Sequence, residues 1–191
     1  MQIFTQLPRH TFEITQGTVA ALPDERLRGL AEYWLSKRGA HGAVPPRSAM
    51  DPLDFPQLLP NIMLIERVLQ DGADRYRFRL AGTAIRHFTG RELTGCFLDE
   101  VVPPEYHEYV RLMNRIVLSE LRPVYSSSLY HDDGNFVNGI TYRLLLPLRR
   151  DGEDETAKVF ACQFWQRREG NGYWAGDWRR VKPEIVVLDA A

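Results

Sequence analysis

Residues 76–98 decide the fold, and they read YRFRLAGTAIRHFTGRELTGCFL. Tyr76 and Phe78 alternate with arginines, the period of a strand with one buried and one solvent-facing side, and we expect this strand over residues 76–80. A glycine then breaks the pattern, and a short helical turn follows over residues 84–88. Two further glycines punctuate the loop that comes next. We expect this segment to form one wall of a small-molecule pocket.

Composition places the chain among ordinary globular proteins. It has 191 residues, 44% of them hydrophobic and 26% charged, and a chain of this length buries about 70% of its unfolded surface. The net charge of -1 gives no electrostatic drive toward nucleic acid. The two cysteines form no CxxC motif, residues 1–20 lack a secretory leader pattern, and no apolar run reaches membrane-spanning length. We therefore expect a cytoplasmic protein without a metal site, a nucleic-acid partner or a membrane partner.

A helix is predicted to begin after Pro23 and to end before Gly39. Leu27, Leu30 and Trp34 recur at helical spacing, with acidic residues first and basic residues last, as the helix dipole favours. Trp34 is too large to stay in water, so this helix must pack on something. Two interpretations are open: the helix covers the back of a sheet, or it forms a dimer contact.

A second, shorter helix is predicted over residues 51–60, between prolines. Asp54 is the expected N-cap, with Pro56 in the first turn.

The remaining pattern predicts five strands and one long helix. The helix begins at Pro104, and its apolar stripe runs from Tyr106 to Val117. The strands are expected at residues 61–69, 76–80, 124–131, 140–150 and 159–166. Two hairpin strands, then helices, then three sequential strands give an α+β fold, in which a five-stranded antiparallel sheet carries its helices on one face.

This order of elements resembles the PAS fold, and in particular a family of stand-alone bacterial PAS proteins most familiar from alphaproteobacteria. The resemblance covers residues 22–166. The matching motifs are Tyr33-Trp34-Leu35, Asp51-Pro52-Leu53, Leu58-Leu59-Pro60, Arg77 to Thr83, Gly90 to Gly95, and Arg143 to Pro147. The resemblance implies a sensory or regulatory domain over residues 61–166, after an N-terminal extension (1–60) and before a C-terminal tail (167–191). It implies a pocket between the sheet and the helices after the second strand, and no particular ligand.

Nine residues are candidates for that pocket. Seven are apolar or aromatic residues that should face it from the sheet and helices: Tyr76, Phe78, Phe88, Leu98, Met113, Tyr142 and Phe164. Arg86 could bind a ligand carboxylate with two hydrogen bonds, and His87 lies in the same short helix.

Haem and flavin are disfavoured as cofactors. Cys96 stands near the position of the reactive cysteine in flavin-binding PAS domains, but the Asn and Arg neighbours of that motif are missing. His107 falls about 120° from the centre of the long helix's apolar stripe, and His87 is a second-choice haem ligand. No nucleophile elbow and no phosphate-binding glycine motif occurs, so no enzyme activity is expected.

The sequence therefore predicts a sensory module that binds a small ligand or a signalling partner and forms a homodimer through the N-terminal helix. A ligand-free interaction scaffold is the alternative, and a cavity below about 300 Å³ would favour it. A small-molecule enzyme of unrecognised type is a third reading, which would require convergent ionisable groups inside the cavity.

Overall fold

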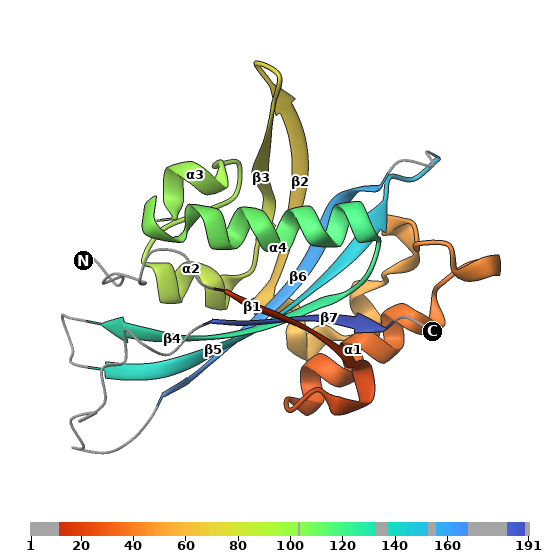
Figure 1. Cartoon of the computed structure of the whole chain (residues 1–191), viewed down its shortest axis with the longest axis horizontal. Coiled ribbons are helices and arrows are strands. Elements are labelled where there is room, and N and C mark those ends of the chain that lie inside the picture. Colours follow the sequence, from red (N-terminus) through yellow and green to blue (C-terminus); the bar gives the residue numbers. More distant parts are fainter. Residues whose placement is uncertain (1–11, 103, 133–136, 153–155, 168–182, 190–191) are drawn as a thin grey trace.

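A single mixed sheet with helices on both faces forms the molecule (Figure 1). The computed structural model describes residues 12–102, 104–132, 137–152, 156–167 and 183–189. The strands are β1 (Glu13–Thr18), β2 (Ile62–Gln70), β3 (Ala73–Ala81), β4 (Val124–Asp132), β5 (Val137–Arg149), β6 (Thr156–Arg167) and β7 (Glu184–Asp189). Their order in the sheet is β1-β7-β4-β5-β6-β2-β3.

Within these ranges, four α-helices and several 3-10 turns connect the strands. The α-helices are α1 (Glu25–Ser36), α2 (Thr83–Thr89), α3 (Leu98–Val101) and α4 (His107–Glu120). The 3-10 turns are η1 (Val19–Ala21), η2 (Ala40–Gly42), η3 (Arg47–Ala49), η4 (Pro52–Asp54), η5 (Pro56–Asn61) and η6 (Pro104–Tyr106). Among the described residues, no helix combines the length and the apolar character that a membrane span requires.

The α+β class is confirmed, whereas the number of strands was wrong. The helices after the second strand lie on one face, as predicted, and the N-terminal helix lies on the other. The five predicted strands form an antiparallel unit in the order β4-β5-β6-β2-β3. Two strands extend it beyond β4: β7 pairs antiparallel with β4, and β1 pairs parallel with β7. The sheet carries helices on both faces because β5 buries consecutive residues, Leu144 and Leu145, in two different cores.

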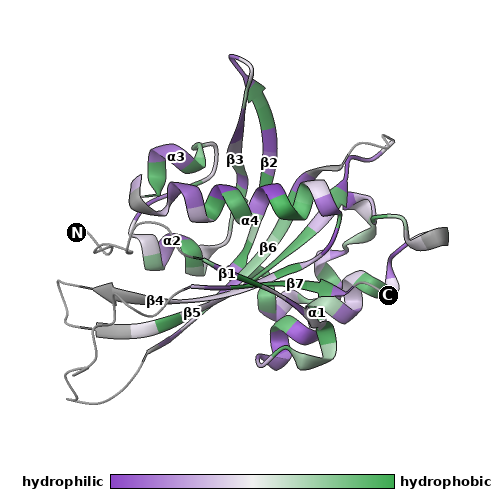
Figure 2. Ribbon diagram, viewed as in Figure 1, coloured by the Kyte–Doolittle hydropathy of each residue, from purple (hydrophilic) through white to green (hydrophobic). Residues whose placement is uncertain are grey.

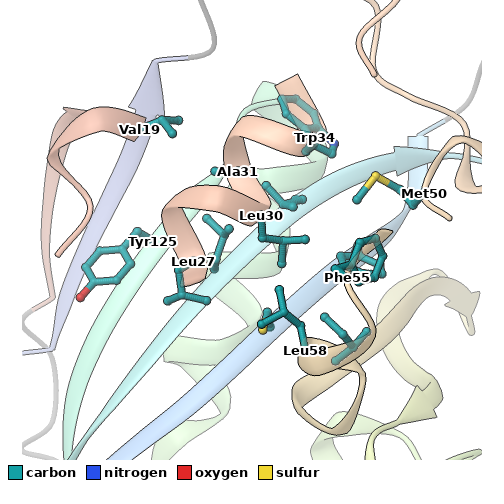
Figure 3. Packing of buried hydrophobic residues seen from close by; sticks show 14 of the residues in the cluster. Val19, Leu27, Leu30, Ala31, Trp34, Met50, Phe55, Leu58 and Tyr125 are labelled. Carbon is teal, nitrogen blue, oxygen red and sulfur yellow. The ribbon is translucent and has the colours of Figure 1, made fainter. Parts of the chain in front are cut away.

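The back core lies between the sheet and the N-terminal elements (Figure 3). The side chain of Asp24 caps α1 by accepting hydrogen bonds from the amides of Arg26 and Leu27 at 2.9 and 3.2 Å. Trp34 is fully buried, and its indole N–H donates to the carbonyl of Pro147 in β5 at 2.9 Å. Of the two interpretations of the α1 stripe, the structure therefore shows packing on the back of the sheet.

The segment predicted as one helix over residues 51–60 is two 3-10 turns, η4 and η5, and Asp54 is not its N-cap. Asp51 caps η4 by accepting from the amide of Leu53 at 2.9 Å. Asp54 instead accepts from the hydroxyl of Tyr33 at 2.7 Å and so ties the turn to α1. Proline at 56 and 60 restricts the backbone and removes donors, which prevents a continuous α-helix.

The front core lies between the sheet and α2, α3 and α4. Figure 2 shows apolar and polar residues alternating along α4, and the apolar ones, including Met113 and Val117, are buried against the sheet. Gly82 begins α2 at a point of close approach, because a Cβ there would lie 2.3 Å from the carbonyl oxygen of Pro60. This close approach fixes α2 against η5.

Candidate ligand cavity

A cavity of about 130 Å³ lies between the front face of the sheet and helices α2 and α4. Most of its lining is apolar or aromatic: Met63, Ile65, Phe78, Ile85, Phe88, Leu93, Leu98, Val102, Tyr106, Tyr109, Val110, Met113, Leu145, Ala161 and Trp165. Six polar residues complete it: Thr89, Asn114, Ser128, Thr141, Arg143 and Gln163. Apolar walls with a few polar groups are the usual composition of a small-molecule site.

Strand alternation determines which residues of β5 and β6 reach the cavity. On β5 the lining residues are Thr141, Arg143 and Leu145, and on β6 they are Ala161, Gln163 and Trp165. These six form three cross-strand pairs, since 141 lies opposite 165, 143 opposite 163, and 145 opposite 161. The residues between them point to the back core.

Arg143 places a positive charge at the wall of this cavity. Its Nε donates to the side-chain oxygen of Gln163 at 2.8 Å, and its Nη1 donates to the hydroxyl of Ser128 at 2.9 Å. Both partners are neutral, and the guanidinium lies 5.9 Å from the centre of the Tyr109 ring. Burial lowers the pKa of Arg143 from its usual value, and the neighbouring Tyr109 and Tyr106 act in the opposite direction.

Two buried polar atoms in the lining have no hydrogen-bond partner among the described residues. One is the side-chain oxygen of Asn114, whose amide nitrogen donates to the carbonyl of Val110 at 2.8 Å. The other is the indole nitrogen of Trp165, whose ring stacks on Phe88 at a centroid distance of 4.0 Å. Buried polar atoms are nearly always paired, so one free acceptor and one free donor beside a cavity require an explanation.

The loop from Gly90 to Leu98 closes one side of the cavity. The amide of Gly95, at φ +88, donates to the carbonyl of Phe78 at 2.6 Å, in a backbone region that glycine tolerates. Asp99, at the start of α3, accepts from Arg75 of β3 at 2.7 and 3.1 Å. The hydrogen bond from Arg75 is the main cause of the lowered pKa of Asp99. These contacts hold the closing loop against the sheet.

The structure brings four of the nine sequence candidates to the cavity wall: Phe78, Phe88, Leu98 and Met113. Tyr76 is buried in the front core but does not line the cavity. Arg86 and His87 are exposed on α2. Tyr142 and Phe164 were placed on the wrong face, because both belong to the back core. Whether the four lining residues bind a ligand is a proposal that we make below.

The polar part of the lining was missed by sequence reasoning. Arg143 interrupts the apolar run of β5, and that charge within a buried strand was the available signal. Asn114 gave no such signal, because it precedes Arg115 in α4, yet it is only 2% exposed. No pattern in the sequence indicated Gln163.

The lining residues do not fit a haem or a covalently bound flavin. No histidine or cysteine is among them. The imidazole of His107 contacts the carbonyl of Val102 at 2.7 Å, and the sulfur of Cys96 lies 3.8 Å from the carbonyl of Glu92. Within the described residues, no group of three or more His, Cys, Asp or Glu side chains could hold a metal ion.

The fold and the cavity define an α+β domain with an internal pocket under a long helix. A family model described as PAS domain matches residues 24–162, so the chain belongs to that PAS-domain family. The chain is similar to a light-oxygen-voltage domain studied with a flavin analogue, at 15% identity and TM-score 0.40, over 60% of this chain and 82% of that one. It is also similar to a LOV protein of Rhodobacter sphaeroides, at 17% identity and TM-score 0.41, over 64% and 72%. No curated protein matches it.

Proposed function

We propose that this protein is a cytoplasmic sensory module that binds a small ligand in the front cavity and signals through a protein partner, without catalysis of its own. The observation that carries the proposal is the cavity itself, which is lined by apolar side chains and a few convergent polar groups between the sheet and α4. Membership of the PAS-domain family supports a sensory role.

The arrangement of α4 suggests how a ligand would act. Tyr109, Met113 and Asn114 of α4 face Arg143 and Gln163 of the sheet across the cavity. A ligand that contacts both walls changes the packing of α4 only to the extent that it binds one arrangement better than another.

The signal would then cross the sheet to α1. Phe164 lies between the cavity residues Gln163 and Trp165 but points to the back face, where the guanidinium carbon of Arg26 lies 3.5 Å from its ring centre. A shift of β6 at the cavity would therefore change the contact between Phe164 and Arg26 in the first turn of α1.

Hydrogen exchange tests this proposal. The protein is first examined by native mass spectrometry, to find any small molecule that co-purifies, and then compared with and without that molecule. We expect altered amide protection in α4 and in the first turn of α1, with the β2–β3 hairpin tip as the internal control. Unchanged protection in both helices at saturating ligand would contradict the proposed mechanism.

One observation favours the ligand-free scaffold as a second candidate. The cavity volume of about 130 Å³ is below the roughly 300 Å³ at which drug-sized ligand sites begin. In that case the protein would act through exposed apolar residues such as Leu53, which is 82% exposed. Native mass spectrometry separates the two candidates, since a scaffold gives only the mass of the bare chain.

The cavity lining gives little support to the hypothesis that the protein is an enzyme. It contains no Asp, Glu, His, Cys or Lys side chain, so general acid-base chemistry would depend on tyrosine and arginine alone.

The homodimer through α1 stays a prediction. Because the apolar stripe of α1 is buried within the chain, such a dimer would have to use the polar outer face, which includes Glu25 and Glu32. Light scattering coupled to gel filtration measures it directly.

A further inference from the structure

The charge of the cavity lining is unbalanced. Among its 21 residues, Arg143 is the one ionised side chain at neutral pH, and no aspartate or glutamate is present. The ion pairs found among the described residues do not include Arg143, whose hydrogen-bond partners are the neutral Gln163 and Ser128. A charge next to apolar walls is costly unless an opposite charge compensates it.

A structural role alone does not account for this arginine. Holding Gln163 and Ser128 in place needs only a neutral hydrogen-bonding side chain, and even a half-buried guanidinium gives up part of its hydration for that purpose. A guanidinium beside a cavity is, however, the group that recognises a planar anion best, because its N–H groups match the two oxygens of a carboxylate.

The two unpaired atoms point to a ligand independently of this charge. Within the part of the chain that the structure describes, the indole N–H of Trp165 is a donor without a partner and the side-chain oxygen of Asn114 is an acceptor without one, and both residues line the same cavity as Arg143. A bound molecule with acceptor oxygens would engage the donor, and its N–H or O–H group, or a bound water, would engage the acceptor.

Size and wall chemistry restrict the rest of the molecule. An apolar cavity of about 150 Å³ holds benzene, so the volume of about 130 Å³ here suits a body of roughly that size or smaller. The aromatic rings of Phe78, Phe88 and Tyr109 favour an apolar or aromatic body over a sugar or a polyanion.

We propose that the cavity binds a small monocarboxylate with an apolar body, with Arg143 as the residue that recognises the carboxylate. The inference rests on the proposed ligand-binding function and names the chemical class of its ligand.

Calorimetric titration with matched probes tests the proposal. Benzoate is compared with benzamide, which has nearly the same shape without the charge, and isovalerate serves as an aliphatic carboxylate. We expect at least one carboxylate to bind, and benzamide to bind at least about 30-fold more weakly than benzoate, because benzamide leaves the arginine uncompensated.

Two variants identify the residue responsible. In Arg143→Met the Kd for the carboxylate should rise at least about 30-fold, while the apo protein should melt at the same or a higher temperature than the wild type. Arg86→Gln is the matched control, since Arg86 lies exposed on α2 beside the same cavity, and its affinity should equal that of the wild type.

The possible results decide between the proposals. Equal affinity for benzoate and benzamide, or unchanged affinity in Arg143→Met, would overturn the carboxylate inference while a ligand cavity remained. Failure of every carboxylate to bind at millimolar concentration would also overturn it. The proposed ligand-binding function would be contradicted together with the carboxylate inference only if native mass spectrometry found no bound molecule of any kind. A large loss of apo stability in Arg143→Met would show a structural arginine and would likewise overturn the inference.

Discussion

At the scale of single residues, the two cysteines have opposite surroundings. Cys162 is fully buried in the back core, and burial raises the pKa of its thiol to about 12. Cys96 is partly exposed in the loop that closes the cavity. Since the thiolate is the reactive form, burial and a high pKa together should protect Cys162.

We therefore expect a thiol reagent at pH 8 to modify one cysteine quickly in the folded protein and both cysteines in denaturant. Timed labelling followed by intact mass measurement counts the modified sites. Cys96→Ser should remove the fast phase and leave only labelling limited by unfolding. Rapid modification of that variant would show that the back core is open around Cys162.

The way side chains divide between the two faces of a strand or helix also explains which part of the cavity could be predicted from the sequence. Phe78 and Met113 were placed correctly because one face of β3 and one stripe of α4 are apolar and the other polar. Strands β5 and β6 bury both faces, so hydrophobicity does not say which residues face α4. Choosing Tyr142 and Phe164 was therefore an error of one residue in register, and Arg143 and Gln163 were overlooked for the same reason.

At the scale of elements, α1 depends on its N-cap. Burial raises the pKa of Asp24, but hydrogen bonds from the side chain of Arg26 and from the amide of Leu27 outweigh it, so the net pKa is lowered. A carboxyl group with a lowered pKa stabilises the folded state above its unfolded pKa of about 3.8. That contribution is lost as the pH falls through the folded value.

Asp24→Ala should lower the free energy of unfolding by about 1 kcal/mol at pH 7, the usual value of an N-cap. The difference from the wild type should shrink as the pH is lowered from 4 toward 2, where the wild-type carboxyl is protonated. Urea titrations at several pH values measure it. Asp24→Asn keeps a side-chain acceptor and should lose less at pH 7. A difference between the wild type and Asp24→Ala that stayed constant with pH would contradict this account.

Elements whose partners are distant in sequence were the hardest to predict. Residues 184–189 lie in the segment that was expected to be a C-terminal tail, although they form β7 against β4. Pairing across some sixty residues of chain leaves no local signal, and β1 is defined only by its parallel pairing with β7. Helix α4, in contrast, carries its own amphipathic pattern and a proline at its start, so its existence was predictable.

At the scale of the whole molecule, one sheet is shared by two cores. The division at residue 60 between an extension and a sensory domain stays a prediction. However, α1, the 3-10 turn η1 before it and the segment from Val44 to Leu58 after it bury apolar residues together with those of β5 and β6. Leu144 belongs to the back core and its neighbour Leu145 to the front core, and they are 0% and 3% exposed. A substitution that disturbs the packing of either core therefore also acts on β5, the strand that both cores share.

Because β5 belongs to both cores, we expect a single cooperative unfolding transition. Leu144→Ala and Leu145→Ala should each lower the free energy of unfolding by about 2–5 kcal/mol, since each leaves a cavity in a packed core. Urea titration followed by circular dichroism and by tryptophan fluorescence should give coincident curves for both variants. Exposed Leu69→Ala, at the tip of the β2–β3 hairpin, is the control and should change stability little. If Leu144→Ala instead produced an early unfolding transition confined to α1, the N-terminal segment would be a separate folding unit. In that case a signal could not pass from the cavity to α1 through a shared sheet.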